Sequence, residues 1–322
     1  MAVYVNTNYS ALQGQRYLGN VQSQLTTTYQ RLSSGMRINS AKDDAAGLQI
    51  ADRLTSQING LNQGNRNASD GIALAQTMEA GMDEVSGMLQ KIRTLAVQAN
   101  NGTNTAEDRT AISKEMSSLA TEVNRIAMKT TYAGKTILNG QTAKDSIFGD
   151  TAAGAPAPGG NKLHGDTGTM TLQVGSNKGD TISFQMTSIM FSVVGNNNNL
   201  MGTNADVIFK TANDGTVTVD LNKAQAANNK TIGDVINLMD TMIAAVDGKR
   251  ADLGAIQNRL ESSIRNQSNV AANEADARSR IRDADFAEES ANLSQQSIIQ
   301  QAAASMLMQA NTRPQLGLSL LG

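Results

Sequence analysis

Hydrophobic residues in the first 140 positions recur at helical spacing, and no proline interrupts them. In the opening segment a thin stripe recurs at intervals of three, four and seven residues, at Leu18, Val21, Leu25 and Leu32. Such spacing marks one face of a helix. The other positions are mostly Gln, Thr, Ser and Asn, so this face is too narrow to fold alone. We expect a helix that is marginal until another surface covers it.

A longer helical pattern follows a break at residues 33–35. Ser40 and Asp43 have the spacing of a capping box, which predicts a helix start at Ser40. From about residue 44 to 99 the pattern predicts a rod roughly 80 Å long, at 1.5 Å per residue. Apart from one three-residue slip, its apolar positions keep heptad spacing: Leu54, Ile58, Leu61, Ala68, Ile72, Ala75, Met78, Met82, Val85, Leu89, Ile92, Ala96 and Ala99. A compact domain does not need a helix of this length.

A turn and a third helix follow the rod. The chain is predicted to turn at residues 100–104, which are rich in Asn and Gly. Thr105 and Asp108 form a second capping box, so we expect the third helix to fold back antiparallel against the end of the rod. Its seam residues are Ile112, Met116, Leu119, Val123 and Ile126. Residues 1 to about 140 are therefore interpreted as helical apart from these breaks.

The sequence changes at about residue 140 to Gly, Asn, Asp and β-forming residues. Segments 170–174 and 181–186 alternate around a Gly-rich turn and predict one hairpin, and 207–210 with 216–221 predict another. Residues 196–199, all Asn, are expected to be a solvated connection. The sequence therefore predicts a β-rich insert.

Helical periodicity then returns for the rest of the chain. Thr231 with Asp234 starts one helix, and a last helix starts near Asp285, with Glu288 three residues on, and is expected to end before Pro314. The first seam is Ile236, Met239, Ile243, Val246, Leu253, Leu260 and Ile264, and the second is Leu293, Ile299, Ala303, Met306 and Ala310. The layout predicts a mainly α fold with a β-rich insert. We expect long N- and C-terminal helices that pair as a coiled coil or helical bundle, and small β-hairpins that form an outer domain.

Composition supports thin helical seams and excludes several kinds of site. Aromatic residues make up 3% of the chain and there is no Trp, so the apolar material is aliphatic and includes 15 Met, which we interpret as seam packing. The net charge of −2, without long charged runs, gives no sign of a basic surface that would bind nucleic acid or an anionic membrane. The absence of Cys excludes disulfides, thiol nucleophiles and zinc ribbons.

Catalytic and cofactor motifs are also missing. His164 is the single histidine and is expected to be a solvated surface residue, so an HExxH zinc site or an ordinary Ser-His-Asp arrangement is excluded within one chain. Residues 134–136 read Gly-Lys-Thr, but Lys129 stands where a phosphate loop needs its first glycine. No apolar run is long enough to span a membrane, and the N-terminus lacks the pattern of a cleaved secretory signal. We expect no enzymatic activity and no cofactor.

The heptad seams at both ends of the chain indicate assembly. Burying one Leu, Ile or Met stabilises by about 1.5 to 3 kcal/mol, and an exposed seam forfeits that gain. The outermost segments, 1–40 and 285–322, can pair with each other, but their stripes are thin and an apolar tail is left over. We expect these ends to become ordered by packing against neighbouring copies. A head-to-tail contact that does not close into a ring produces a filament.

Two stretches carry a family resemblance. Residues 30–48, QRLSSGMRINSAKDDAAGL, closely resemble the N-terminal signature of bacterial flagellins, and the match continues to about residue 140. Residues 277–290, ARSRIRDADFAEES, resemble the C-terminal signature of that family, as do residues 309–311 near the end. Together the matching stretches cover roughly two thirds of the chain.

The resemblance implies a structural subunit of the extracellular flagellar filament, used for swimming, with three domains. Residues 1–42 with 281–322 would form a terminal coiled-coil polymerisation domain, 43–139 with 231–280 a long-helix rod domain, and 140–230 a β-rich variable outer domain. The expected inter-subunit packing residues are Leu18, Val21, Leu25, Leu32, Leu293, Ile299, Met306, Leu316 and Leu320.

The same resemblance implies a set of partners. These are further copies of the chain in a helical homopolymer, a flagellar export chaperone, the type III export apparatus, the filament cap and the hook-filament junction proteins. Export through that apparatus needs no cleaved signal peptide, which reconciles the N-terminus with an extracellular location.

The family is also sensed by the host's Toll-like receptor 5. The residues matching its recognition face are Lys91, Arg93 and Leu95, with Glu115 on the next helix. Leu95 lies one position off the predicted seam, so we expect it at the surface.

Two other functions remain open from the sequence. A hook-filament junction protein shares the terminal helices but polymerises only into a short adapter, and a secreted hydrolase could carry acid–base carboxylates in the insert. The full signature over residues 30–60 disfavours the first, and no paired acidic spacing in the insert favours the second.

Overall fold

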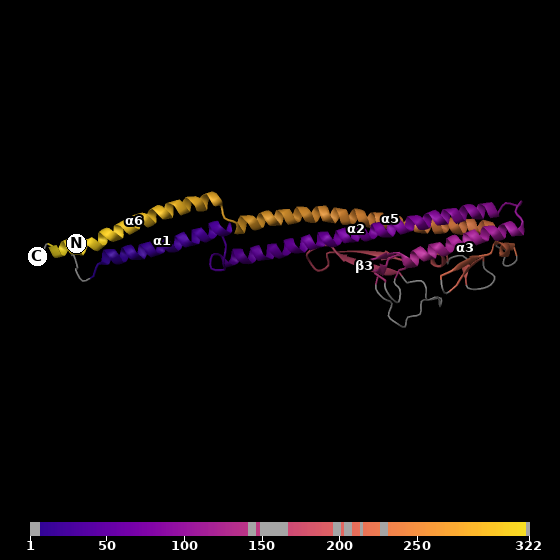
Figure 1. Cartoon of the computed structure of the whole chain (residues 1–322), viewed down its shortest axis with the longest axis horizontal. Helices are drawn as coiled ribbons and strands as arrows, with labels where there is room; N and C mark the ends of the chain where they lie inside the picture. The colour runs from indigo at the N-terminus through magenta and orange to yellow at the C-terminus, as the bar shows by residue number, and fades with distance from the viewer. Residues whose placement is uncertain are drawn as a thin grey trace, which may run out of the picture. The chain divides into compact units, whose positions relative to one another are not determined.

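The chain is mainly helical, as Figure 1 shows for the computed structural model. The predicted fold class is confirmed, because long helices at both ends of the chain flank a set of short strands. The structure describes residues 7–140, 146–148, 167–195, 201–202, 208–212, 215–225 and 231–319, with the backbone alone at 201–202, 224–225 and 313–319. The predicted connection at 196–199, His164 and Leu320 lie outside these residues.

The chain forms two compact units. We call Met1–Asn59 with Asn269–Gly322 the terminal unit, and Gly60–Ser268 the inner unit. The division falls inside two long helices, α2 (Ala45–Ala99) and α5 (Ile232–Arg282). The three-domain division expected from the resemblance stays a prediction.

The terminal unit contains an antiparallel pair of helices, α1 (Tyr9–Ser34) and α6 (Phe286–Ser319). Asn8 caps α1 because its side-chain oxygen accepts a hydrogen bond from the N–H of Ala11. Gly35 ends the helix in the left-handed conformation, at φ 69°, which confirms the predicted break. The expectation that the last helix stops before Pro314 is wrong, because α6 continues through that residue.

The predicted start of the second helix at Ser40 is also wrong. Asp43 accepts hydrogen bonds from the backbone N–H groups of Ser40 and Asn39, and these bonds lower the pKa of its carboxyl group. They close a turn that precedes the helix. The residue that caps α2 is Asp44, whose Oδ1 accepts a hydrogen bond from the N–H of Gly47 at 2.9 Å.

The seam expected along the rod is confirmed. Leu54 and Ile72 are partly buried, and the other predicted positions are buried: Ile58, Leu61, Ala68, Ala75, Met78, Met82, Val85, Leu89, Ile92, Ala96 and Ala99. From Ala68 onward these residues belong to, or pack against, a core that α3 (Ala106–Lys129) and α5 share with the strands. The capping box of Thr105 and Asp108 at the start of α3 is present as predicted.

The expectation of helix as far as residue 140 is wrong beyond Lys129. Two short antiparallel strands, β1 (Thr131–Tyr132) and β2 (Lys135–Thr136), follow α3. Ala133 and Gly134, the two residues between them, have φ of 49° and 81°. Two central residues with positive φ are typical of the tight turn that joins paired strands. The Gly-Lys-Thr sequence at 134–136 is therefore the second half of a hairpin.

The described part of the β-rich insert contains the two predicted hairpins and also elements that were not expected. β3 (Gly168–Gln173) pairs antiparallel with β4 (Thr181–Met186), and β6 (Phe209–Thr211) pairs antiparallel with β7 (Val217–Val219). The unexpected elements are β5 (Met201–Gly202), parallel to β6, and the single helical turn α4 (Phe191–Val194). The 3₁₀ turn η1 (Leu221–Gln225) follows β7.

Side chains of α3 form a ladder of hydrogen bonds with the backbone of β7 and of the first residue of η1. Hydroxyl oxygens spaced four residues apart on the helix accept from N–H groups spaced two apart along the strand. The pairs are Ser113 with Leu221 at 3.2 Å, Ser117 with Val219 at 2.8 Å and Thr121 with Val217 at 3.1 Å. Four helical residues rise about 6 Å and two strand residues about 6.6 Å, so the two spacings match. The ladder satisfies N–H groups that an edge strand otherwise leaves open.

Asn124 extends this ladder by less than one turn of α3 and is fully buried. Its Nδ2 donates to the carbonyl oxygen of Gly215 at 2.8 Å, and its Oδ1 accepts from the N–H of Phe191 at 2.8 Å. One amide therefore joins α3 to the turn before β7 and to the start of α4.

A glycine on α2 allows the β3–β4 hairpin to approach the helix closely. A Cβ on Gly64 would lie 2.1 Å from the carbonyl oxygen of Val174, which follows β3. Nearby, Asn67 donates from Nδ2 to the carbonyl oxygen of Gln173 at 2.9 Å. A larger residue at position 64 would force the backbone of the hairpin away from α2.

Candidate functional site

The helix pair of the terminal unit holds the predicted inter-subunit packing residues. α1 and α6 lie side by side and run in opposite directions (Figure 1). Val21 is buried, Met306 is 70% exposed, and the partly buried members are Leu18, Leu25, Leu32, Leu293 and Ile299. Leu316 lies on α6, where the backbone alone is described. The pair therefore buries part of its apolar surface and leaves part of it uncovered, while the role of these residues between subunits stays a prediction.

Two polar contacts join α1 to α6 near opposite ends of the pair. Asn8 donates from Nδ2 to the carbonyl oxygen of Ala310 at 2.8 Å. At the other end, Nη1 of Arg31 lies 3.1 Å from Oε1 of Glu289, whose carboxylate is buried. A buried carboxylate needs such a partner, because an unpaired charge away from water is strongly unfavourable.

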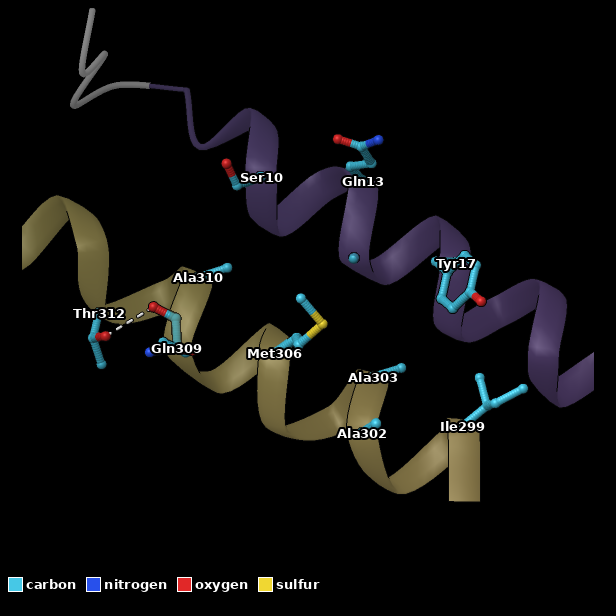
Figure 2. A pocket seen from close by; sticks show the side chains of 11 residues that line it. Ser10, Gln13, Tyr17, Ile299, Ala302, Ala303, Met306, Gln309, Ala310 and Thr312 are labelled. Carbon is cyan, nitrogen blue, oxygen red and sulfur yellow. Dashed lines mark hydrogen bonds between the residues drawn. The ribbon is translucent and has the colours of Figure 1, made fainter. Parts of the chain in front are cut away.

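A groove of about 900 Å³ runs between the two helices (Figure 2). Gly14 and Tyr17 line it from α1, and Ala303, Met306 and Ala310 line it from α6. Figure 2 shows the side chains of these three α6 residues on the side that faces α1. The groove is lined by apolar side chains of different sizes together with polar ones, among them Ser10, Gln13 and Gln309.

Exposed hydrophobic side chains are concentrated on the terminal unit. Eleven large hydrophobic side chains of the described residues are exposed, and ten of them belong to this unit. They are Tyr9, Leu12, Tyr17, Tyr29, Ile50, Val270, Phe286, Ile298, Met306 and Met308, and the eleventh is Val97 on the inner unit. Exposed apolar surface collected in one part of a protein indicates an interaction surface.

The residues expected to meet the host receptor lie on the inner unit. Nζ of Lys91 on α2 pairs with Oε1 of Glu115 on α3 at 3.0 Å, and both side chains are about half exposed. Arg93 makes two hydrogen bonds to Asp240 on α5, at 2.5 and 3.3 Å, and hydrogen bonding to this carboxylate raises the pKa of its guanidinium. These charged side chains are accessible, and their role in receptor recognition stays a prediction.

The expectation that Leu95 lies at the surface is wrong, because it is 8% exposed and belongs to the core. Leu95 stands four residues after Lys91 and so lies on the side of α2 that faces α3. Because α2 contacts α3 on one side and α5 on another, its buried face is wider than a single heptad seam.

The part of the chain that the structure describes offers neither a metal-binding cluster nor a membrane-spanning helix. Within it, no group of three or more His, Cys, Asp and Glu side chains is placed to hold a metal ion. No helix in that same part combines the length and the apolar character that crossing a membrane requires.

Family models match both ends of the chain. The bacterial flagellin N-terminal helical region matches residues 5–143, and the bacterial flagellin C-terminal helical region matches residues 236–321. Together the two models cover more than half of the chain, including α1, α2, α3 and α6.

Relatives that are named flagellin are similar to this chain over its whole length. Flagellin B of Vibrio cholerae is 36% identical and flagellin B of Vibrio anguillarum 35%, and each alignment covers 100% of both chains. A solved structure from Vibrio parahaemolyticus, named as a flagellar hook-associated protein, covers 75% of this chain and 100% of its own, with a TM-score of 0.55. At 18% identity that structure supports the fold alone. The paired terminal helices, the two matching family models and the full-length relatives place this chain in the bacterial flagellin family, whose members are structural subunits of the flagellar filament.

Proposed function

We propose that this chain builds the flagellar filament through contacts between the terminal units of neighbouring copies. The observation that carries the proposal is the concentration of exposed hydrophobic side chains on that unit. Covering them in a polymer removes apolar surface from water, at about 25 cal/mol per Å². Contacts of one copy with the next that do not close into a ring continue indefinitely as a helical polymer.

Electron microscopy of the purified full chain, at rising concentration and salt, tests the proposal. We expect long uniform tubes, because hydrophobic association is strengthened by salts such as sulfate and is concentration-dependent. Short seeds of sheared tubes should elongate when fresh chain is added. A chain that stays a compact monomer under all these conditions would contradict the proposal.

We also propose that the chain leaves the cell uncleaved through the flagellar type III apparatus. The export chaperone, the filament cap and the hook-filament junction proteins would be its partners on that route, and its role would be structural rather than enzymatic. The small number of buried side chains on α1 and α6 supports this proposal, because helices that depend on little packed core are easily kept unfolded for passage through a narrow channel. Mass spectrometry of subunits from washed filaments should give the full 34.0 kDa chain, and a consistently shorter mass would contradict uncleaved export.

The exposed charged residues of the inner unit support a second partner, the host's Toll-like receptor 5. We propose that Lys91, Arg93 and Glu115 contact this receptor, while buried Leu95 holds α2 against α3 beneath them. Arginine presents a planar fork of donors that suits a protein interface, so Arg93 is the residue on which binding should depend most.

A receptor-dependent reporter in cultured cells can test the role of Arg93. We expect Arg93→Ala to raise the concentration of chain needed for half-maximal response about tenfold, the effect of losing roughly 1.4 kcal/mol of binding. Arg125→Ala is the matched control, since Arg125 is an exposed arginine paired with Glu122 on α3. Equal responses from the two variants would argue against the proposed contact.

A further inference from the structure

Pro314 leaves one carbonyl group of α6 without its usual donor. In an α-helix the N–H of each residue donates to the carbonyl oxygen four residues earlier. Proline has no N–H, so the carbonyl of Ala310 receives nothing from position 314 although the helix runs on to Ser319. A proline in this place disfavours the helix unless another group supplies the missing hydrogen bond.

The missing donor comes from Asn8, the residue that caps α1. Nδ2 of Asn8 donates to the carbonyl oxygen of Ala310 at 2.8 Å, while Oδ1 of the same side chain accepts from the N–H of Ala11 at 3.1 Å. The side-chain oxygen of Asn8 thus caps the start of α1, and the side-chain nitrogen supplies the hydrogen bond that α6 lacks. A carboxylate could cap α1 equally well but has no N–H to donate, so only the second of these contacts requires an amide.

The position of this hydrogen bond is consistent with the rest of the helix pair. The ion pair of Arg31 with Glu289 lies 23 residues along α1 from Asn8 and 21 residues along α6 from Ala310. At 1.5 Å per residue these spans are about 34 and 32 Å, so the two contacts can form together at this register. Between them Gly14 gives room to Leu307, whose Cδ1 would lie 3.3 Å from a Cβ at position 14. A slip of α6 by one turn, about 5.4 Å, would break both contacts.

We propose that Asn8 is a positioning residue for assembly: by donating to the carbonyl that Pro314 leaves open, it sets the register of α1 and α6 and makes completion of α6 depend on docking of α1. Before docking, the proline keeps the end of α6 from closing its hydrogen bonds alone. After docking, the exposed apolar side chains of the two helices have fixed positions relative to one another along the helix axes, as a regular polymer requires. This inference rests on the proposed assembly through the terminal unit.

The test combines Asn8→Asp with Pro314→Ala in the full chain. Asn8→Asp keeps the cap of α1 and removes the donor to Ala310, whereas Pro314→Ala restores the N–H within α6. We expect Asn8→Asp alone to raise the critical concentration for seeded filament growth about tenfold, and to change it less than twofold when Pro314→Ala is also present. Asn20→Asp is the matched control, because it makes the same chemical change at an exposed position of α1 and should have no effect in either background.

Each other result would overturn the proposal. If Asn8→Asp were equally harmful with and without the proline, the asparagine would be acting through something other than the open carbonyl. If Asn8→Asp were harmless in both backgrounds, the hydrogen bond would not matter for assembly. If Pro314→Ala alone prevented growth, the proline would be needed for more than removing a donor. All three outcomes leave growth of the unmodified chain intact, so they are distinct from failure of the proposed function.

Discussion

Replacing Asn124 with alanine is expected to lower the free energy of unfolding of the inner unit by about 3 kcal/mol. The substitution leaves two buried backbone groups without partners, the carbonyl of Gly215 and the N–H of Phe191. An unsatisfied buried polar group costs about 1 to 3 kcal/mol, and here two are created at once. For a unit of this size the melting temperature should fall by about 6 to 12 °C.

Thermal unfolding followed by circular dichroism, together with hydrogen exchange, can measure this effect. Hydrogen exchange should show faster exchange at Phe191, because its N–H loses the acceptor. Ser118→Ala is the matched control, since Ser118 is exposed on the same helix and its hydroxyl donates only within the helix, to the carbonyl of Lys114. A melting temperature of Asn124→Ala within a degree or two of this control would show that the amide does not hold the insert to α3.

The long seams could be predicted from the sequence because they depend on local periodicity alone. Met78, Met82 and Val85 are buried where heptad spacing places them, and the capping box of Thr105 and Asp108 forms as expected. These features need only residues within one or two helical turns of one another.

Features that depend on distant segments could not be predicted in the same way. Leu95 is buried because α2 contacts a second helix, which the phase of one seam does not reveal. The open carbonyl beside Pro314 and its donor on Asn8 are 302 residues apart, so only the folded chain brings them together. For these contacts the sequence shows suitable residue types, and the tertiary fold chooses the partners.

The polar stripe on α3 is an intermediate case. Ser113, Ser117 and Thr121 recur every four residues, and this pattern is visible in the sequence. Taken alone it is typical of a solvated helix face. Its match to the two-residue repeat of a strand becomes informative only once β7 is known to lie beside the helix.

Replacing both Ile298 and Met306 with glutamine is expected to prevent filament growth at micromolar concentrations. Both side chains are about two-thirds exposed on α6, at 67% and 70%, so the proposed assembly would bury them against a neighbouring copy. Burial of each is worth about 1.5 to 3 kcal/mol, and losing both would raise the critical concentration by roughly a hundredfold to ten-thousandfold. Seeded elongation, followed by sedimentation and electron microscopy, measures the change.

The comparison with Val97→Gln separates loss of assembly contacts from a general effect of removing apolar surface. Val97 is 49% exposed but lies on the inner unit, so its replacement should leave seeded growth close to that of the unmodified chain. Glutamine favours helix about as well as methionine and better than isoleucine, so α6 should not lose helix through propensity. If the Ile298 and Met306 variant grew as readily as the Val97 variant, the exposed residues of α6 would not be assembly contacts. If Val97→Gln were the more harmful change, the principal contact between copies would belong to the inner unit.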